Sequence, residues 1–446
     1  MNVKRYLGFL LFAVATALIA AGCSKDKDDE ELIDPPGEEA ILQGTLNANT
    51  TLAADKEWIL KGYVYVPDGV TLDIEPGTII KSDVSEKGAL CIERGGRINA
   101  EGTADKPIIF TSGKEPGSRA PGDWGGVVIL GKAKTNRSST PVIEGGLDRP
   151  YGGDDDEDNS GVLKYVRIEY AGVAAFPNSE INGLTLGAVG RGTTIENIQI
   201  AYGNDDSYEF FGGTVNAKYL VAFATADDDF DFDFGYRGMI QHAIALRDPS
   251  FVDNGDAGNG VEADNDGTGT DASPRTHPVL SNFTWIGPNN APGTAANHNF
   301  GNRWRRGVEF EVYNSVMLGW QKAGISMESD LTAESYNTGV SKLRANIVHT
   351  NAAGETFRSN SDILKAADFE TKALADGNTK LVDAAGVLND PFNIAAPDFS
   401  PVTGGGADTG ADFTGLDVFF TATSHKGAVG QENWLQGWTR FFTKGN

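Results

Sequence analysis

Cysteine is almost missing from the chain, and this scarcity excludes a disulfide-stabilised fold. The 446 residues contain two cysteines, Cys23 and Cys91. Cys23 closes an apolar leader, so Cys91 has no intrachain partner in the processed protein. The Ala-Leu-Cys-Ile run around Cys91 is typical of a small buried side chain, and we expect no chemical role for it.

Histidine and the familiar catalytic motifs are also scarce. None of the five histidines stands at zinc-ligand spacing from another histidine or a cysteine. The sequence has no Gly-Xaa-Ser-Xaa-Gly elbow and no phosphate-binding loop, so it does not resemble the hydrolases and nucleotide-binding proteins that carry them. The histidines are His242, His277, His298, His349 and His425.

Basic residues are much fewer than acidic residues. Lys and Arg number 37 against 62 Asp and Glu, which gives a formal net charge of −25. Such an acidic surface repels nucleic-acid phosphates, so a nucleic-acid partner is not expected. A polyanionic ligand would need a bridging cation. With hydrophobic residues at 40% and charged residues at only 22%, the chain can still bury a large core.

The start of the chain predicts a lipid anchor. Lys4 and Arg5 precede an apolar run over residues 6–21, which is too short for a comfortable membrane span. The run ends in Ala-Ala-Gly-Cys23 and resembles a lipobox, although Ala20 stands where that pattern prefers Leu. We therefore predict a signal peptide over 1–22, lipidation at Cys23, and an acidic flexible tether over 23–40. The charged run directly after Cys23 also resembles the surface-export signal of Bacteroidota lipoproteins.

From Trp58 onward the sequence alternates between short β-rich runs and turns. The run that begins at Leu163 resembles those that begin at Ile195, Ala217 and Ile240, with about one solenoid coil between starts. Each coil of a parallel β-helix buries its inward side chains on the next coil, and such repeats suit this arrangement. We predict an all-β parallel β-helix, a solenoid, over residues 41–360.

Several segments depart from the repeat. Long loops are expected over residues 113–123, 147–159 and 248–276. Residues 361–387 read as helix, and the last segment, which is rich in Trp and Phe, is expected to cap an open end of the solenoid. Residues 361–446 are therefore predicted to be a helical segment and a C-terminal cap packed on the β-helix.

Four runs carry a resemblance to a known family. They are Val70–Lys81, Gly117–Gly131, Tyr208–Val215 and Trp434–Thr439. Together they resemble a poorly characterised family of bacterial outer-membrane lipoproteins of Bacteroidota and spirochaetes. The resemblance implies a right-handed, pectate-lyase-like parallel β-helix and a lipid-anchored position on the outer membrane, facing the exterior of the cell. It supplies no catalytic residues.

Alternating carboxylates and phenylalanines form the first candidate site. From Asp229 to Phe234 the two residue types alternate, so in a strand they occupy opposite faces. A similar acidic segment lies one coil earlier, and neighbouring strands would place the carboxylates about 4.8 Å apart. Such charges either spread into solvent or hold a hard cation such as calcium. The candidate residues are Asp205, Asp206, Glu209, Asp229, Asp231 and Asp233.

A second acidic candidate lies within the longest loop. Glu262, Asp264 and Asp266 alternate and are followed by Gly267, which resembles the opening of a calcium loop. It is not an EF-hand, because Ser273 occupies the twelfth position, where that motif needs a bidentate Glu. A calcium-stabilised surface loop and a simple Asp/Gly turn cluster both fit.

The third candidate is basic. Arg303, Arg305 and Arg306 surround Trp304 and would suit a carboxylate or a sugar ring. The three arginines would equally form ion pairs with the carboxylates of the first candidate site and so stabilise the structure. We expect this second arrangement. A lyase of the pectate type would need calcium and an arginine that takes a proton. Asp231, Asp233 and Arg237 contain these groups, but their spacing does not bring them together.

These observations favour a surface-exposed, lipid-anchored β-helix without catalytic activity. It would bind a glycan or a protein partner, as an accessory to an outer-membrane transporter in nutrient uptake. One alternative is a calcium-dependent polysaccharide lyase or glycoside hydrolase on the same fold. Another is an adhesive or structural surface protein. Calcium is the one cofactor that the sequence suggests.

Overall fold

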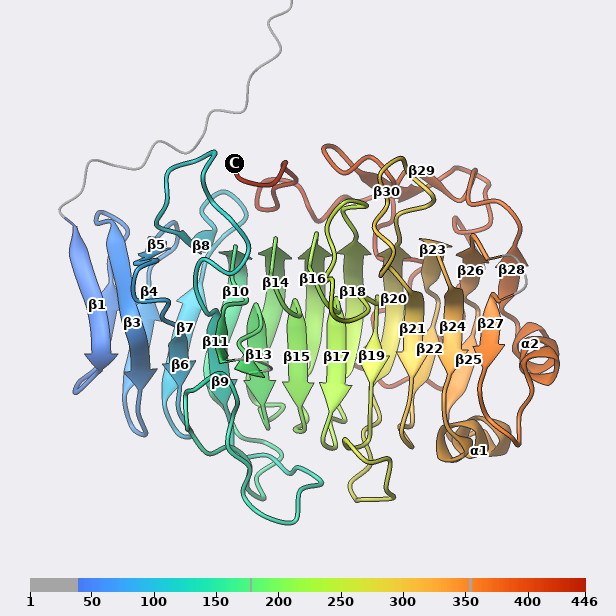
Figure 1. Cartoon of the computed structure of the whole chain (residues 1–446), viewed down its shortest axis with the longest axis horizontal. Coiled ribbons are helices and arrows are strands. Elements are labelled where there is room, and N and C mark those ends of the chain that lie inside the picture. Colours follow the sequence, from blue (N-terminus) through green and yellow to red (C-terminus); the bar gives the residue numbers. More distant parts are fainter. Residues whose placement is uncertain (1–38, 177–178, 353–354) are drawn as a thin grey trace, which may run out of the picture. The chain divides into compact units, whose positions relative to one another are not determined.

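The computed structural model describes residues 39–176, 179–352 and 355–446. Within them the chain winds into a right-handed parallel β-helix, in which each strand pairs with the strand one coil further on (Figure 1). The predicted fold class is confirmed. The predicted signal peptide, Cys23 and the acidic run after it lie outside the described residues.

Each coil contributes strands to three faces of the solenoid. The first face contains β2 (Thr50–Leu52), β4 (Thr71–Ile74), β7 (Arg97–Glu101), β22 (Glu311–Tyr313) and β25 (Lys342–Arg344). The second face contains β5 (Ile79–Ser82), β8 (Ile108–Ser112), β23 (Val316–Trp320), β26 (Ile347–Thr350) and β28 (Thr379–Leu381). The third face contains β6 (Leu90–Ile92), β9 (Val127–Leu130), β13 (Leu184–Gly187), β15 (Tyr208–Phe211), β17 (Phe230–Asp233), β19 (Glu262–Ala263), β21 (Phe300–Trp304), β24 (Ala323–Met327) and β27 (Phe357–Ser359).

Longer strands continue across a corner and so belong to two faces. Those that join the first and second faces are β10 (Gly161–Glu169), β14 (Thr194–Ala201), β16 (Ala217–Phe223), β18 (Met239–Leu246) and β20 (Val279–Ile286). Those that join the second and third faces are β1 (Ala40–Thr45) and β3 (Trp58–Val66). Two antiparallel pairs lie outside the coils: β11 (Ala174–Phe176) with β12 (Ser179–Glu180), and β29 (Leu388–Asp390) with β30 (Asp398–Pro401).

The sequence repeats are the neighbouring strands of the solenoid. Leu163 pairs with Ile195, Ile195 with Ala217, Ala217 with Ile240, and Ile240 with Leu280. One residue in the middle of each long strand has a positive φ, which turns the strand from the first face to the second. These corner residues are Tyr165, Asn197, Tyr219, His242 and Asn282, with φ between 50° and 62°.

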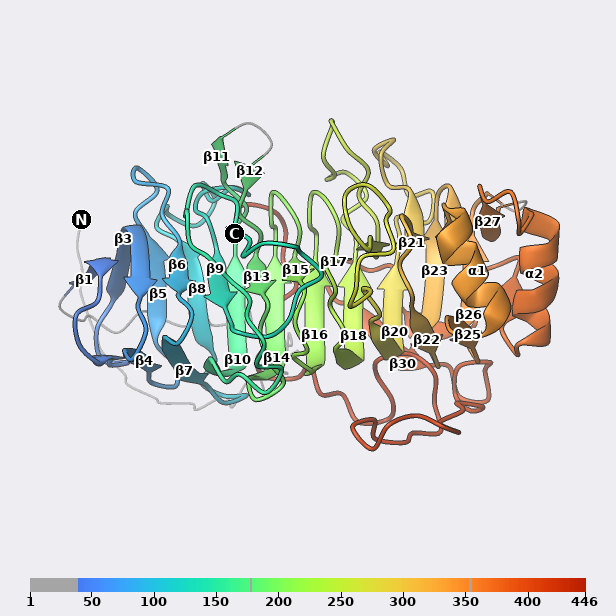
Figure 2. The same cartoon turned by 90° about the horizontal axis from the view of Figure 1, so that it is seen from below.

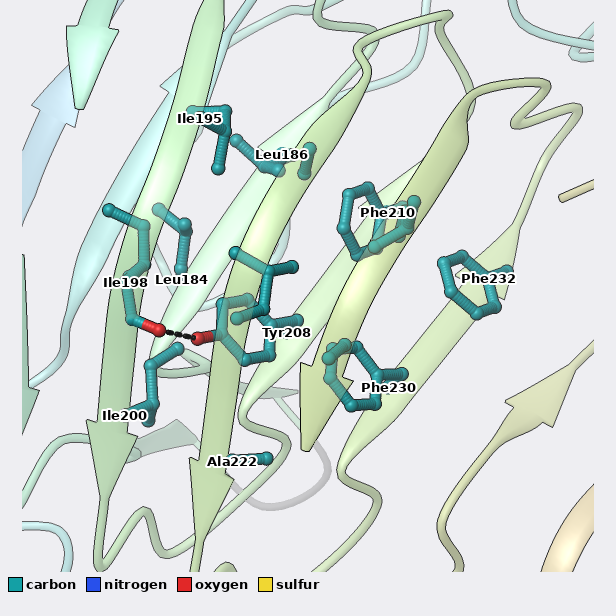
Figure 3. Packing of buried hydrophobic residues seen from close by; sticks show 14 of the residues in the cluster. Leu184, Leu186, Ile195, Ile198, Ile200, Tyr208, Phe210, Ala222, Phe230 and Phe232 are labelled. Atoms are coloured by element: carbon teal, nitrogen blue, oxygen red, sulfur yellow. Dashed lines mark hydrogen bonds between the residues drawn. The ribbon is translucent and has the colours of Figure 1, made fainter. Parts of the chain in front are cut away.

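The core is built from the inward-facing residues of all three faces. On the third face, the inward rings of Phe210 and Phe232 lie on neighbouring strands with centroids 5.0 Å apart (Figure 3). Tyr208 stacks on Phe230 in the same way, and its hydroxyl donates a hydrogen bond to the carbonyl oxygen of Ile198, at 2.7 Å. Because these rings face inward, the residues between them must face outward.

Two helices replace corner loops near the C-terminal end of the solenoid (Figure 2). Helix α1 (Asp330–Thr338) begins after Ser329, whose side chain accepts a hydrogen bond from the Thr332 amide. Helix α2 (Ala366–Ala375) packs against β27. Residues 361–387 were expected to be helical, and this prediction is right for α2. It is wrong for residues 379–381, which form strand β28 and pair with β26.

The last segment does not cap an end of the solenoid, contrary to expectation. Residues 402–446, here the C-terminal strap, run back along the flank of the coils (Figures 1 and 2). Hydrogen bonds join it to successive coils: Asn314 to Asp412, Asn282 to His425, Gln241 to Thr421, Gln199 to Arg440, and Tyr202 to Phe442. The strap covers the bent corner because side chains of the corner residues offer polar and aromatic partners there. Trp438, for example, packs edge-on against Tyr165.

Among the described residues, no helix is both long enough and apolar enough to cross a membrane.

Candidate functional site

Three carboxylates stack on the outer surface of the third face. Glu209 on β15 pairs in register with Asp231 on β17, and Asp231 pairs with Glu262 on β19. The next strand in the series places Arg303 opposite Glu262. We call Glu209, Asp231 and Glu262 the carboxylate row. Their outward direction follows from the inward rings of Phe210 and Phe232 on the same strands.

A second set of carboxylates lies at the corner that leads into these strands. Asp206 and Asp228 each stand two residues before the first residue of a third-face strand. Their side chains form a ladder, because Oδ1 of Asp206 accepts a hydrogen bond from the Asp228 amide at 2.8 Å. Oδ1 of Asp228 accepts one from the Asn259 amide at 2.6 Å. Asn182 begins the ladder by accepting a hydrogen bond from the Asp206 amide.

The row and the ladder together bring carboxylate oxygens close enough to share one ion. In each of three groups, one oxygen from every member lies within 4.8 Å of the others. The groups are Asp205, Asp206 and Asp227; Asp206, Glu209 and Asp231; and Asp228, Asp231 and Glu262. Consecutive groups share or adjoin residues, so the groups form a continuous acidic patch rather than isolated clusters.

The patch is shielded from water although it is rich in charge. Asp206, Asp228 and Glu209 expose only 7%, 4% and 8% of their surface. Burial and then the neighbouring carboxylates raise the pKa of Asp206, Glu209, Asp228 and Asp231 well above the ordinary range. For Asp227, burial followed by Asp256 and Glu262 raises the pKa to about 7.

A hard divalent cation fits this donor set. Calcium binds six to eight oxygens at about 2.3–2.6 Å, so two oxygens on opposite sides of the ion lie about 4.8 Å apart. The patch offers carboxylate oxygens within that separation, and among the described residues no ion pair joins Asp206, Asp228 or Asp231 to a Lys or Arg. Three carboxylates fill only part of the coordination sphere, and the remaining positions would be open to a ligand.

Asp229 and Asp233 do not share the environment of Asp231, although the alternation grouped all three. Asp229 is fully buried and forms an ion pair with Arg247 at 3.1 Å. It lies in the corner before β17, so the alternation of the strand does not reach it. Asp233 ends β17, and its side chain accepts a hydrogen bond from the Phe234 amide. Burial is the main cause of the raised pKa of Asp233.

The second acidic candidate is not one loop. Glu262 lies on β19 within the carboxylate row, so the expected excursion over 248–276 is two loops divided by a strand. Asp264 pairs with Arg305 at 2.6 Å. Asp266 accepts hydrogen bonds from Thr268 and Thr270, which hold its pKa below the ordinary value although burial acts to raise it. The three side chains therefore do not converge on one cation.

The basic candidate forms an ion-pair network at the end of the carboxylate row. Of the two alternatives for these arginines, this structural pairing is the one that we expected. Arg303 contacts Glu262 at 2.8 Å and Glu328 at 3.1 Å. Arg305 contacts Glu262 and Asp264, and Arg306 contacts Asp264 at 2.6 Å. Burial would lower the pKa of Arg303 and Arg305, but these carboxylates outweigh it and raise both.

Trp304 cannot serve as a platform for a ligand. It points inward, is fully buried, and stacks on Phe310 with ring centroids 4.3 Å apart. The prediction that it contacts a ligand is wrong because Trp304 pairs with Ala263, an inward position on β19, whereas Arg303 and Arg305 on either side point outward.

Arg237 is also held away from the acidic patch. Its guanidinium group forms an ion pair with Asp156 at 3.2 Å, through both terminal nitrogens. Asp156 belongs to the long loop before β10, so Arg237 fastens that loop to the turn after β17.

Sequence reasoning missed four members of the site: Asn182, Asp227, Asp228 and Asn259. A signal was present. In four consecutive coils an Asn or Asp stands two residues before the position that starts the paired register of the third-face strand, as with Asn182 before Leu184 and Asp228 before Phe230. Repetition of that offset across coils is the mark of a side-chain ladder.

The fold and the acidic patch define a β-solenoid protein with a charged outer face. The family model described as pectate-lyase-like beta helix domain matches residues 44–439, and the chain belongs to this family. No curated protein and no solved structure matches the chain.

Proposed function

We propose that the protein is a cell-surface lipoprotein that binds a glycan or protein partner on its third face through a divalent cation, calcium. The overlapping carboxylate groups around Asp206 and Asp231 carry this proposal. At neutral pH a patch of this kind must either take up protons or hold a cation. Calcium in the patch would offset the mutual repulsion and would leave coordination positions for oxygen atoms of the ligand.

The direction of the carboxylate row favours an extended ligand. Glu209, Asp231 and Glu262 follow the axis of the solenoid, with about 4.8 Å between coils. A chain molecule lying along that axis would meet one rung after another. Sugar hydroxyls and carboxylates are hard oxygen donors, and so are peptide carbonyls and acidic side chains, so either type of ligand suits calcium.

A calcium-dependent lyase is the second candidate, favoured by the position of Arg303 beside the carboxylate row. A catalytic base must release its proton near the working pH. The carboxylates around Arg303 and Arg305 raise the pKa of both, and Arg237 is paired with Asp156, so these arginines are poorly suited to accept a proton. This balance favours binding over elimination chemistry.

The proposed location rests on the lipobox that ends at Cys23 and on the acidic run after it. Metabolic labelling with a fatty-acid analogue tests the anchor, with Cys23→Ser as the control that should lose the label. Crosslinking in intact outer membranes tests the partner. Recovery of a β-barrel transporter supports the role in uptake, and recovery of no specific protein argues against it.

Calorimetry tests the site itself. We expect saturable calcium binding by the wild-type protein, loss of it in Asp231→Asn, and no change in Asp55→Asn, which alters an exposed carboxylate elsewhere. A glycan screen with calcium and with chelator then tests whether ligand binding follows the cation. Release of unsaturated products from uronic-acid polymers would replace the binding proposal with the lyase.

A further inference from the structure

Two segments that are far apart in the sequence meet over the second face. The loop after β8, residues 113–123, meets the end of the C-terminal strap, where the Gly117 amide donates a hydrogen bond to the Gly445 carbonyl oxygen. The backbone carbonyl of Arg119 lies close to Gly445 as well. Beneath this contact runs the second half of β10, whose outward residues Arg167 and Glu169 are buried.

Three arginines belong to the segments that meet at that contact. Arg167 projects outward from β10 and exposes only 9% of its surface. It pairs in register with Gln199 on β14, and the side chain of Gln199 holds both the amide and the carbonyl group of Arg440. Gln199 thus holds the backbone of Arg440 above the strand next to Arg167. Arg119 comes from the loop above, and its charge acts on both Arg167 and Tyr170.

The nearby side-chain carboxylates are already engaged, and the last residue, Asn446, accepts a hydrogen bond from the Tyr170 hydroxyl. Glu169 accepts hydrogen bonds from Arg167 at 3.1 Å and from Thr111 at 2.9 Å. Asp123 forms an ion pair with Lys114 at 2.5 Å and accepts further hydrogen bonds from Ser112 and the Ala120 amide. Glu169 is thus the one side-chain carboxylate in this part of the described structure that forms an ion pair with any of the three arginines.

Most of the arginine donors have no partner. Among the described residues, Arg119 donates only from Nε, to the Lys114 carbonyl oxygen at 3.1 Å, and Arg167 donates only from Nε, to Glu169. The guanidinium group of Arg440 lies over the Phe442 ring and donates no hydrogen bond. The terminal nitrogens of all three groups therefore remain available for bidentate recognition of an oxyanion.

The excess of positive charge is costly in this position. Burial lowers the pKa of Arg167, and Arg440 and Arg119 lower it further although Glu169 opposes them. Such a cluster stands out in a chain of net charge −25. An anion between the guanidinium groups would offset their repulsion and satisfy their free donors.

We propose that Arg119, Arg167 and Arg440 form a binding site for a small oxyanion, either free phosphate or sulfate or an equivalent group carried by a larger ligand. The site lies on the second face and is independent of the acidic patch. It also assigns a role to the Gly117–Gly131 run, whose first residues hold Arg119 against the strap.

Thermal unfolding at constant ionic strength tests the proposal. Sodium phosphate or sulfate, exchanged for chloride at low millimolar concentration, should raise the melting temperature saturably. Sulfate stabilises proteins in general at much higher concentration, so saturation distinguishes the site from exclusion effects. Arg119→Gln and Arg440→Gln should each weaken the apparent affinity at least tenfold. Both side chains are partly exposed, so neither substitution leaves a cavity in the hydrophobic core.

The matched control is Arg94→Gln, which removes one positive charge at a distant corner where the arginine donates to the Gly152 carbonyl oxygen. Equal responses in the control and in Arg119→Gln would identify an adventitious ion only and would overturn the proposal. No saturable response of the wild-type protein to phosphate or sulfate would overturn it too. A response to one of the two anions, lost in both site variants, would support it and identify the preferred chemistry.

Discussion

Replacing Asp228 with asparagine should make the metal-free protein more stable. Its Oδ1 accepts a hydrogen bond from the Asn259 amide, and an asparagine oxygen can accept the same bond. The substitution therefore keeps the ladder and removes a charge from a group in which Asp231 and Glu262 offer oxygens within 4.8 Å.

The size of the gain follows from this distance. Two unit charges 4.8 Å apart repel by about 0.9 kcal/mol in water and about 3.5 kcal/mol at an effective dielectric constant of 20. Because Asp228 is buried but the rim of the patch is partly exposed, we expect Asp228→Asn to gain about 1–3 kcal/mol at pH 8.

The gain should depend on pH. The pKa of Asp228 is raised in the folded protein, so the folded state binds a proton that the unfolded state releases above about pH 4. The free energy of unfolding of the metal-free wild type should therefore fall as the pH rises from 4 through the raised pKa values of the patch. The pKa of Asp227, for example, is about 7. Asp228→Asn should show a shallower fall, and calcium should flatten the wild-type curve because it replaces the protons.

Urea unfolding in chelator and in calcium, at pH 5 and pH 8, measures all of these effects. Asp55→Asn, at an exposed site, is the matched control and should change nothing. The reasoning is refuted if Asp228→Asn is less stable than wild type in chelator at pH 8, or if it keeps the full response to calcium.

Other side chains give further expectations. Trp304→Ala should cost about 3–5 kcal/mol in urea unfolding, because the ring is fully buried on Phe310; a loss of ligand binding at unchanged stability would contradict this. Asp229→Ala should cost about 3–5 kcal/mol because it leaves Arg247 buried without its partner, and a neutral result would show that water reaches the pair. His277 lies between two glutamates, and although burial opposes them they raise its pKa to about 9. Its contribution to stability should be complete below about pH 6.5 and lost as the pH rises through 9, and NMR titration that gives a pKa near 6.5 would refute this.

Most of the solenoid could be predicted because its coils repeat. The match between the runs at Leu163 and Ile195 is also their register in the structure, since inward positions must stay aligned to share one core. The alternation of Asp and Phe on β17 likewise gave the outward direction of Asp231. A repeating core constrains local sequence strongly, and both features are local.

The rest depended on contacts that local patterns do not encode. The strap lies along the flank because its residues pair with side chains at or beside the corner, such as Asn282 and Gln241, which are more than 140 residues away in sequence. The division of the long acidic loop by β19 is equally non-local, because it is fixed by pairing with Asp231 on one side and Arg303 on the other. Two residues of strand are too few to leave a recognisable pattern.

A crystal structure grown in calcium, beside one grown in chelator, tests the central claim most directly. The account predicts difference density in the acidic patch, about 2.3–2.6 Å from oxygens of Asp231 and at least two neighbours among Asp206, Glu209, Asp228 and Glu262. A patch that stays free of density at saturating calcium, with the carboxylates in the same positions, would contradict the account.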